Sequence, residues 1–187
     1  MRIEEIYEKI NILKKEKNAV ILAHNYQFGE VQEAADFVGD SLDLSRKAAE
    51  VKEDVIVFAG VHFMAETAAI LAPDKTVLLP ERSAGCPMAD MITADEIRRW
   101  KADFPGRTVI CYVNTSAAVK AECDICCTSA NALRVVEAAP GDEILFAPDR
   151  NLAAWAARGT KKKIIPWDGY CYVHNNIHAR DVESRLR

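Results

Sequence analysis

The sequence has 187 residues, of which 50% are hydrophobic and 28% are charged, and its formal net charge is −4 at pH 7. This composition is typical of a globular protein with a buried core and excludes a disordered or fibrous chain. The acidic balance favours neither nucleic acid nor a membrane as a partner. No apolar run approaches the roughly 20 residues that span a bilayer, and the charged residues 1–17 do not resemble a secretory signal, so we expect a cytoplasmic protein.

Short runs of β-branched residues alternate along the chain with amphipathic or alanine-rich segments. The runs predict strands at residues 19–23, 55–59, 76–79, 108–113, 124–127, 143–146 and 163–166. The intervening segments predict helices at residues 41–51, 63–71, 93–104, 130–138 and 151–158. Strand alternating with helix indicates βαβ units and a parallel sheet.

The chain also resembles itself. An offset of 88 residues aligns residues 21–23 with 109–111 and Ser41 with Ser129, and an offset of 85 aligns Cys86 with Cys171. Any two βαβ stretches share a hydrophobic pattern, but matched polar residues favour a true repeat. We therefore predict pseudo-symmetric three-layer α/β modules with short parallel sheets, two of an expected three copies.

The repeat sets the expected domain boundaries. The first module occupies residues 1–85 and the second occupies residues 86–172. Residues 173–187 form a charged helical segment that would lead into a third module absent here. Exposing the face where that module would dock predicts an apolar patch and a tendency to associate.

Cys86 and Cys171 stand in equivalent loops that follow predicted strands. In parallel α/β modules the carboxyl ends of strands face the ligand crevice. Two thiolates from equivalent loops suit an iron–sulfur cluster, and a third module would supply a third thiolate. The alternative is that both are ordinary half-buried thiols.

A second group of cysteines, Cys123, Cys126 and Cys127, could join His174 and His178 in a zinc site. The gap between the cysteines and the histidines is far from zinc-finger spacing. Neighbouring side chains of a strand also point to opposite faces, which disfavours one metal bound by both Cys126 and Cys127. We expect Cys111 to be a core residue.

Polar side chains recur at the carboxyl ends of the predicted strands. Ser41 and Ser129 each precede a predicted helix, where a serine caps the helix or helps bind an anion, and both roles are compatible. His24 and Tyr112 occupy equivalent positions in the two modules, so substrate contact or proton transfer is expected there. A period of two would place Tyr112 and Asn114 on the same side of their strand.

Several segments together resemble the quinolinate synthase family: LAHNYQ at 22–27, GDSLDLSR at 39–46, FAGVHFMAET at 58–67, YVNTSAAVKAECD at 112–124, CTSANA at 127–132 and APDRNLA at 147–153. The resemblance implies three pseudo-symmetric modules around a 4Fe–4S cluster held by three cysteines. It also implies condensation of iminoaspartate with dihydroxyacetone phosphate to quinolinate, phosphate and water in NAD biosynthesis. Aspartate oxidase or aspartate dehydrogenase would be the upstream source of iminoaspartate.

The resemblance also implies roles for individual residues. Cys86 and Cys171 would be cluster ligands, and Tyr26 would help to close the site and, with His24, would move protons. The substrates would contact His24, Ser41, Tyr112, Asn114 and Ser129. The third module, with its third cysteine and a His-Pro-Glu segment, has no counterpart in these 187 residues. The alternative is a non-catalytic dicarboxylate-binding or split-assembly fragment without a cluster.

Overall fold

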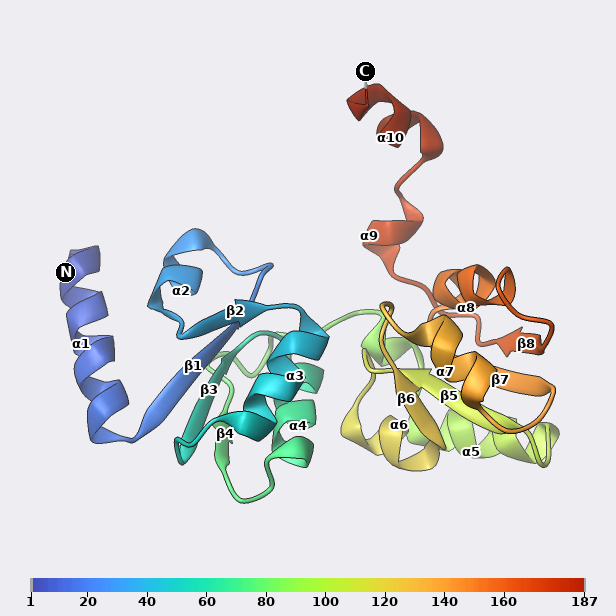
Figure 1. The fold of residues 1–187 in the computed structure, drawn as a ribbon, viewed down its shortest axis with the longest axis horizontal. Helices are drawn as coiled ribbons and strands as arrows, with labels where there is room; N and C mark the ends of the chain where they lie inside the picture. Colours follow the sequence, from blue (N-terminus) through green and yellow to red (C-terminus); the bar gives the residue numbers. More distant parts are fainter. Residues whose placement is uncertain (1, 187) are drawn as a thin grey trace. The chain divides into compact units, whose positions relative to one another are not determined.

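The computed structural model describes residues 2–186, and the chain divides into two compact units, Met1–Gly85 and Cys86–Arg187. Each unit contains one four-stranded sheet in which every pair of neighbouring strands is parallel (Figure 1). The predicted class of repeated α/β modules with short parallel sheets is therefore confirmed.

Unit 1 alternates helices and strands from its first element. Its elements are α1 (Ile3–Glu16), β1 (Ala19–His24), α2 (Gly29–Ala34), β2 (Phe37–Gly39), α3 (Ser41–Glu50), β3 (Val55–Ala59), α4 (His62–Leu71) and β4 (Thr76–Leu78). The strand order is β2-β1-β3-β4. Helices α3 and α4 pack together on one face of the sheet, and α1 and α2 lie on the other side (Figure 1).

Unit 2 repeats this order after a single turn of 3-10 helix, η1 (Ala89–Met91). Its elements are α5 (Ala94–Asp103), β5 (Thr108–Tyr112), α6 (Ala117–Glu122), β6 (Ile125–Cys127), α7 (Ala132–Ala138), β7 (Glu143–Ala147), α8 (Arg150–Ala157), β8 (Lys163–Pro166), α9 (Tyr172–Asn175) and α10 (Ala179–Arg185). The strand order β6-β5-β7-β8 matches that of unit 1. Helices α5 and α6 cover one face of the sheet, and α7 and α8 cover the other.

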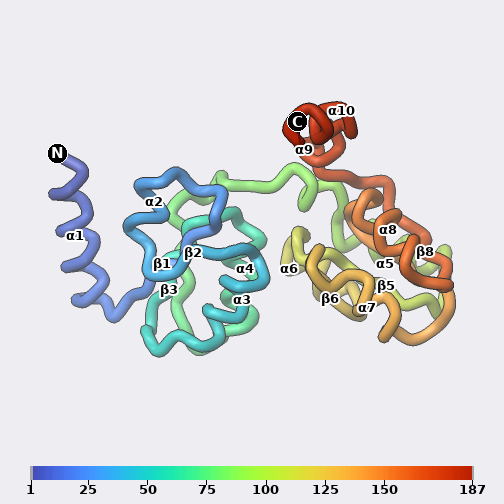
Figure 2. Tube along the Cα trace, turned by 45° about the horizontal axis from the view of Figure 1, so that its top comes forward, coloured from blue at the N-terminus to red at the C-terminus, as the bar shows by residue number. Residues whose placement is uncertain are grey.

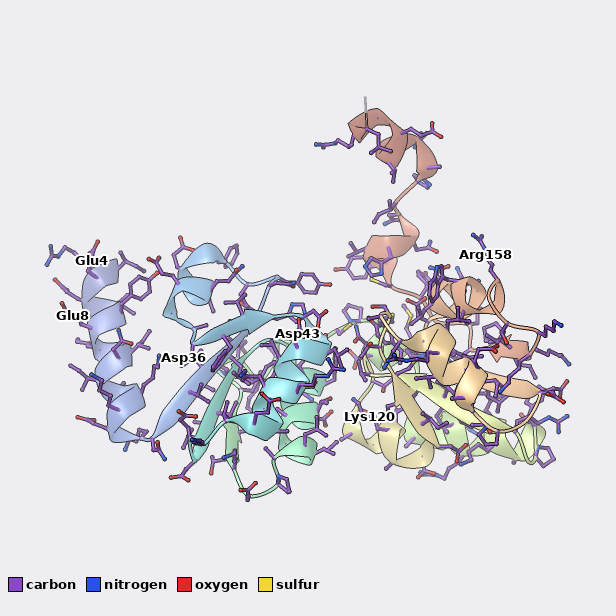
Figure 3. All side chains as sticks on the ribbon, viewed as in Figure 1. Glu4, Glu8, Asp36, Asp43, Lys120 and Arg158 are labelled. Atoms are coloured by element: carbon purple, nitrogen blue, oxygen red, sulfur yellow. The ribbon has the colours of Figure 1, made fainter. Side chains whose placement is uncertain are left out.

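In each unit, an aspartate that precedes the second strand accepts a hydrogen bond from the first strand. Asp36, labelled in Figure 3, accepts a hydrogen bond from the Ile21 amide at 2.8 Å. Asp124, which lies 88 positions later, accepts one from the Val109 amide, also at 2.8 Å. The repeat therefore extends from the hydrophobic pattern to individual hydrogen bonds.

Strand β2 and helices α2 and α6 were not predicted from the sequence. β2 is a three-residue edge strand whose Phe37 and Val38 are both exposed, so its side chains do not alternate between buried and exposed positions. An edge strand of this length is specified by its pairing with β1 more than by its own pattern. The offset of 88 residues places β2 on β6 and could have revealed it.

The two units differ in how their first helix packs. In unit 2, Ile97 and Trp100 of α5 enter a core with Ile92 and the partly buried Trp167. In unit 1, α1 buries no residue, and an apolar groove of about 630 Å³ separates it from the sheet. The groove is lined by Ile6, Tyr7 and Ile10 of α1 and by alternate strand residues, Ala19, Ile21, Val55 and Val57.

The C-terminal segment carries the counterpart of α5. Figure 2 shows that α9 and α10 project away from the sheet and the other helices of unit 2. In α5 and the segment before it, Ile92 and Ile97 are buried, whereas the equivalent Ile177 and Val182 are exposed. Helix α10 begins later than the predicted segment 173–187 because His178 forms its N-cap. Within residues 2–186, no helix is both long enough and apolar enough to cross a membrane.

Candidate functional site

In unit 1, the end of β1 and the start of α3 bring His24 and Ser41 together. The Nε2 atom of His24 lies 3.4 Å from Oγ of Ser41. His24 is paired in register with Gly39 of β2, two residues before Ser41. The contact joins two of the residues expected to bind substrate.

Ser41 does not cap its helix. The N-cap of α3 is Asp40, whose carboxylate accepts hydrogen bonds from the amides of Leu42 and Asp43 at 2.8 and 2.9 Å. Of the two roles left open for Ser41, capping is therefore excluded, because the charged carboxylate of the preceding aspartate accepts from these amides. The Ser41 hydroxyl therefore stays on the side of His24. Asp40 was not predicted as a site residue, although a Gly-Asp-Ser run before a helix is a capping signal.

Burial sets the protonation of His24. The residue is only 3% exposed, and this burial lowers its pKa below the ordinary value, while the nearby Asp40 opposes the shift. Nδ1 accepts a hydrogen bond from the Tyr26 amide at 3.3 Å. With Nδ1 acting as an acceptor, the neutral ring carries its proton on Nε2, which faces Ser41.

Tyr26 lies against His24 on the solvent side. The two ring centroids are 4.2 Å apart, and the Tyr26 side chain is 80% exposed. Phe28, the N-cap of α2, is similarly exposed. An aromatic ring in this position can be moved at little packing cost because little of it is buried.

In unit 2, Tyr112 ends β5 and Asn114 lies in the bend that follows. The predicted strand extended to residue 113, but β5 ends at Tyr112, so a period of two does not relate the two side chains. The Oδ1 atom of Asn114 is buried and has no hydrogen-bond partner among the residues that the structure describes. A buried acceptor without a donor is costly, and such groups are common where a ligand binds.

Ser129 lies in an exposed turn before α7 rather than at the start of that helix. The N-cap of α7 is Asn131, whose Oδ1 atom accepts from the Thr128 amide at 2.7 Å and so closes the turn. The expectation that Ser129 opens the helix is wrong for this reason. Its hydroxyl remains accessible near the carboxyl end of β6.

The loops that carry Cys86 and Cys171 meet within unit 2. Both thiols are half-buried, and loops separate them from the strands that precede them. Between the two loops, Met91 accepts a hydrogen bond from Trp167 Nε1 at its carbonyl, at 2.9 Å, and one from the Tyr170 amide at its sulfur, at 3.3 Å. These bonds fix the segment after Cys86 against the residues just before Cys171.

Gly169 explains how the Cys171 loop is held. A side chain at this position would place a Cβ atom 2.5 Å from the carbonyl oxygen of Pro148. The Gly169 carbonyl also accepts a hydrogen bond from the Arg150 amide at 2.8 Å. The loop after β8 therefore packs against the loop after β7, and neither contact was anticipated from the sequence.

The second group of cysteines does not form a metal site among residues 2–186. No cluster of three or more His, Cys, Asp or Glu side chains there is arranged to hold a metal ion. Cys126 is exposed on the edge strand β6, while Cys127 is buried on the opposite face, against α7. Cys111 is fully buried, as expected.

The same finding bears on an iron–sulfur cluster. Cluster irons are held by cysteine thiolates, and a 4Fe–4S cluster of the expected type needs three of them. Cys86 and Cys171 are suitable donors, but the described part of the chain gathers no third ligand beside them. The residues present fit part of such a site and do not complete it.

Comparisons with known proteins agree over nearly the whole chain. Residues 8–187 match the family described as NadA: Quinolinate synthetase A protein. The chain is 63% identical over 182 residues to a quinolinate synthase of Dehalococcoides mccartyi, which covers 97% of this chain and 60% of that protein. It is 57% identical over 187 residues to the quinolinate synthase of Geobacter metallireducens, which covers 100% of this chain and 61% of that protein. The chain thus spans about 60% of the length of these relatives, and it belongs to the quinolinate synthetase A family.

Proposed function

We propose that this chain forms the first two modules of a quinolinate synthase, which condenses iminoaspartate with dihydroxyacetone phosphate. The observation that carries the proposal is the pairing of His24 with Ser41 at the carboxyl end of β1. In parallel α/β units this edge of the sheet is where ligands bind. Family membership indicates the reaction, and the side chains of each unit would supply its chemistry.

His24 is proposed to donate a hydrogen bond to a substrate oxygen. Its lowered pKa keeps the ring neutral, and the Tyr26 amide holds Nδ1 as an acceptor, so the proton stays on Nε2. A neutral imidazole that donates from a fixed nitrogen stabilises negative charge that develops on a carbonyl oxygen. Tyr26 is proposed to cover the bound substrate because its exposed ring already lies on His24.

Ser41 and Ser129 are proposed to bind the anionic groups of the substrates through their hydroxyls. In unit 1 the amides of Leu42 and Asp43 already donate to Asp40, so we assign the anion contact to the hydroxyl of Ser41. The Asp40 carboxylate would repel a phosphate dianion in direct contact with this helix end. Ser41 is therefore better suited to a carboxylate of iminoaspartate than to the phosphate group.

Tyr112 and Asn114 are proposed to contact substrate from unit 2. The unpartnered Oδ1 of Asn114 needs a donor, and both an imine N–H and a ketose hydroxyl provide one. A substrate that satisfies this acceptor relieves a desolvation cost that the free protein bears. Asn114 would thus contribute to affinity and to orientation together.

Cys86 and Cys171 are proposed to supply two ligands of a 4Fe–4S cluster, and the rest of a full-length protein is proposed to supply the third. When bound, an open iron of such a cluster acts as a Lewis acid toward substrate oxygens. The hydrogen bonds of Met91 to Trp167 and Tyr170 keep the two cysteine loops together. The proposed cytoplasmic location and the upstream supply of iminoaspartate by aspartate oxidase or aspartate dehydrogenase follow from this assignment alone.

A chimera tests the proposal. Residues 1–187 would replace the matching part of the Dehalococcoides relative, and quinolinate formation would be measured after anaerobic reconstitution with iron and sulfide. We expect activity in the chimera and a loss of about 100-fold or more on His24→Ala, as for other groups that stabilise developing charge. Ser45→Ala is the matched control, since Ser45 lies one turn along α3 and bonds the Ser41 carbonyl. A cluster-loaded chimera without activity, or full activity in His24→Ala, would contradict the proposal.

The alternative is a dicarboxylate-binding fragment without chemistry. To test this alternative, the 187-residue chain would be titrated with malate, and binding would be detected by NMR chemical-shift changes of the His24 ring. Binding together with an inactive, cluster-loaded chimera would support the fragment. Activity of the chimera would exclude it.

A further inference from the structure

Cys111 and Cys126 form a close thiol pair that lies outside the proposed substrate and cluster residues. They are register partners on the adjacent parallel strands β5 and β6, and their sulfur atoms are 3.4 Å apart. Neighbouring strands are about 4.8 Å apart, which falls within the usual Cα separation of disulfide-bonded cysteines. Rotation of the two side chains would bring the sulfur atoms to bonding distance with little movement of the backbone.

The two thiols differ in access to solvent. Cys111 is fully buried in β5, whereas Cys126 is exposed because β6 is the edge strand of its sheet. An oxidant can therefore reach Cys126 first, and Cys111 lies directly behind it. A hydrogen bond with Cys123 and burial raise the pKa of Cys111, while its hydrogen bond with Cys126 opposes that shift. The hydrogen bond with Cys111 and burial raise the pKa of Cys126, while the charge of Lys120 on α6 (Figure 3) opposes the shift there.

Of the other two nearby cysteines, Cys123 is the competing partner, because it lies close enough to Cys111 to raise the pKa of that thiol. Cys127 points to the opposite face of the sheet, into the core with α7 and α8. Cys123 ends α6, and its thiol donates a hydrogen bond to the Val119 carbonyl at 3.2 Å. Both provide matched controls on the same stretch of chain.

The repeat shows that the fold does not require this pair. In unit 1 the equivalent register partners are Ala23 and Val38, which occupy the same places in β1 and β2. Two thiols thus replace two aliphatic side chains at one position of one unit. The strands on either side keep the same pairing in both units.

We propose that Cys111 and Cys126 form a reversible disulfide when the protein meets a small-molecule disulfide. The Cys126 thiolate attacks one sulfur of the oxidant, a mixed disulfide forms, and one small thiol leaves with the proton that Cys126 lost. The Cys111 sulfur then attacks the Cys126 sulfur, the mixed disulfide breaks, and the second small thiol leaves with the proton from Cys111. Two protein thiols are oxidised, and one small disulfide is reduced to two thiols.

The bond would lock β6 to β5 immediately before the residues proposed to bind substrate. Tyr112 follows Cys111 directly, and the Val113 amide donates to the Cys127 carbonyl at 2.8 Å. Oxidation of the thiol pair would therefore restrain the backbone next to the residues proposed to bind substrate in unit 2. This inference does not depend on the proposed function, since it concerns the thiols alone.

Peptide mapping after oxidation tests the proposal. The folded 187-residue chain would be treated with glutathione disulfide at mildly alkaline pH, because the thiolate is the attacking species. Trypsin cuts after Arg107, Lys120 and Arg134, so the disulfide would link peptide 108–120 to peptide 121–134. We expect this linked pair in the parent chain and its disappearance after treatment with dithiothreitol.

Variants identify the partner of Cys111 within peptide 121–134. The link is expected to persist in Cys123→Ala and Cys127→Ala and to be lost in Cys126→Ser, whose exposed position tolerates the change. The proposal is overturned if the folded parent forms no linked pair, if the link persists in Cys126→Ser, or if Cys126 remains a mixed disulfide with glutathione. Circular dichroism of each variant confirms that the fold is retained.

Discussion

The Nε2 atom of His24 lies 3.4 Å from the Ser41 hydroxyl, and this contact joins the end of β1 to the first turn of α3. Because Asp40 caps that helix, Ser41 is left free of the capping role that a serine in this place normally has. The carboxylate of Asp40 also lies close enough to oppose the effect of burial on the pKa of His24. Helix capping and the protonation of the candidate site are thus linked through a single aspartate.

His24 is expected to titrate below the ordinary histidine value of about 6.5. The unfolded chain then binds more protons than the folded one between the two pKa values, so stability falls as pH drops below about 6.5. NMR titration of the ring protons would give the midpoint directly. His24→Gln is the matched control for stability, and an unchanged pH dependence in that variant would contradict the assignment.

Asp40 is expected to matter in two separable ways. Asp40→Ala removes the cap of α3 and should cost about 0.5–2 kcal/mol of unfolding free energy. Asp40→Asn keeps a capping oxygen but removes the charge, so it should cost less while lowering the pKa of His24 further. Chemical denaturation and the histidine titration measure the two effects independently. Equal losses of stability in the two variants would argue against Asp40 as the cap.

Gly169→Ala is expected to destabilise unit 2 by about 1–3 kcal/mol, because the new Cβ atom meets the Pro148 carbonyl at 2.5 Å. Gly29→Ala at the start of α2 is the control, since a Cβ atom there meets nothing within 4 Å. That control should be neutral or stabilising by up to about 1 kcal/mol. Urea unfolding of both variants measures the difference. Equal stability would show that the Cys171 loop does not depend on this close approach.

Asn114→Ala is expected to separate binding from stability. Its Oδ1 atom has no partner among residues 2–186, so removing that acceptor should change the unfolding free energy by less than about 1 kcal/mol. In the chimera described above, quinolinate formation should fall by about tenfold or more, since a hydrogen bond to substrate is lost. Full activity with unchanged stability would remove Asn114 from the site.

The sequence predicts seven of the eight strands well. Each of the seven predicted ranges lies within one residue of the observed strand at either end, because these strands are short β-branched or apolar runs. β2 was missed because its side chains are exposed at the sheet edge and pairing alone specifies it. The helix that Ser129 was expected to open begins three residues later, where Asn131 forms the N-cap.

The candidate site was predicted in its residue types but not in its connections. The repeat placed His24 and Ser41 at strand ends, yet their contact depends on the register of β1 with β2, which the sequence does not display. Met91 and Gly169 act through contacts with residues far along the chain, which leave no local pattern in the sequence. Asp40 acts through a local contact, and the capping signal before α3 is its one trace in the sequence.

The most direct test of the account is the iron and acid-labile sulfide bound per chain after anaerobic reconstitution. We predict that the 187-residue chain alone retains much less than four irons, because Cys86 and Cys171 supply only part of the ligand set. The chimera with the remaining part of a relative should bind about four irons and lose them on Cys171→Ala, while Cys127→Ala should retain them. Four irons on the isolated chain, or a cluster unaffected by Cys171→Ala, would contradict the account.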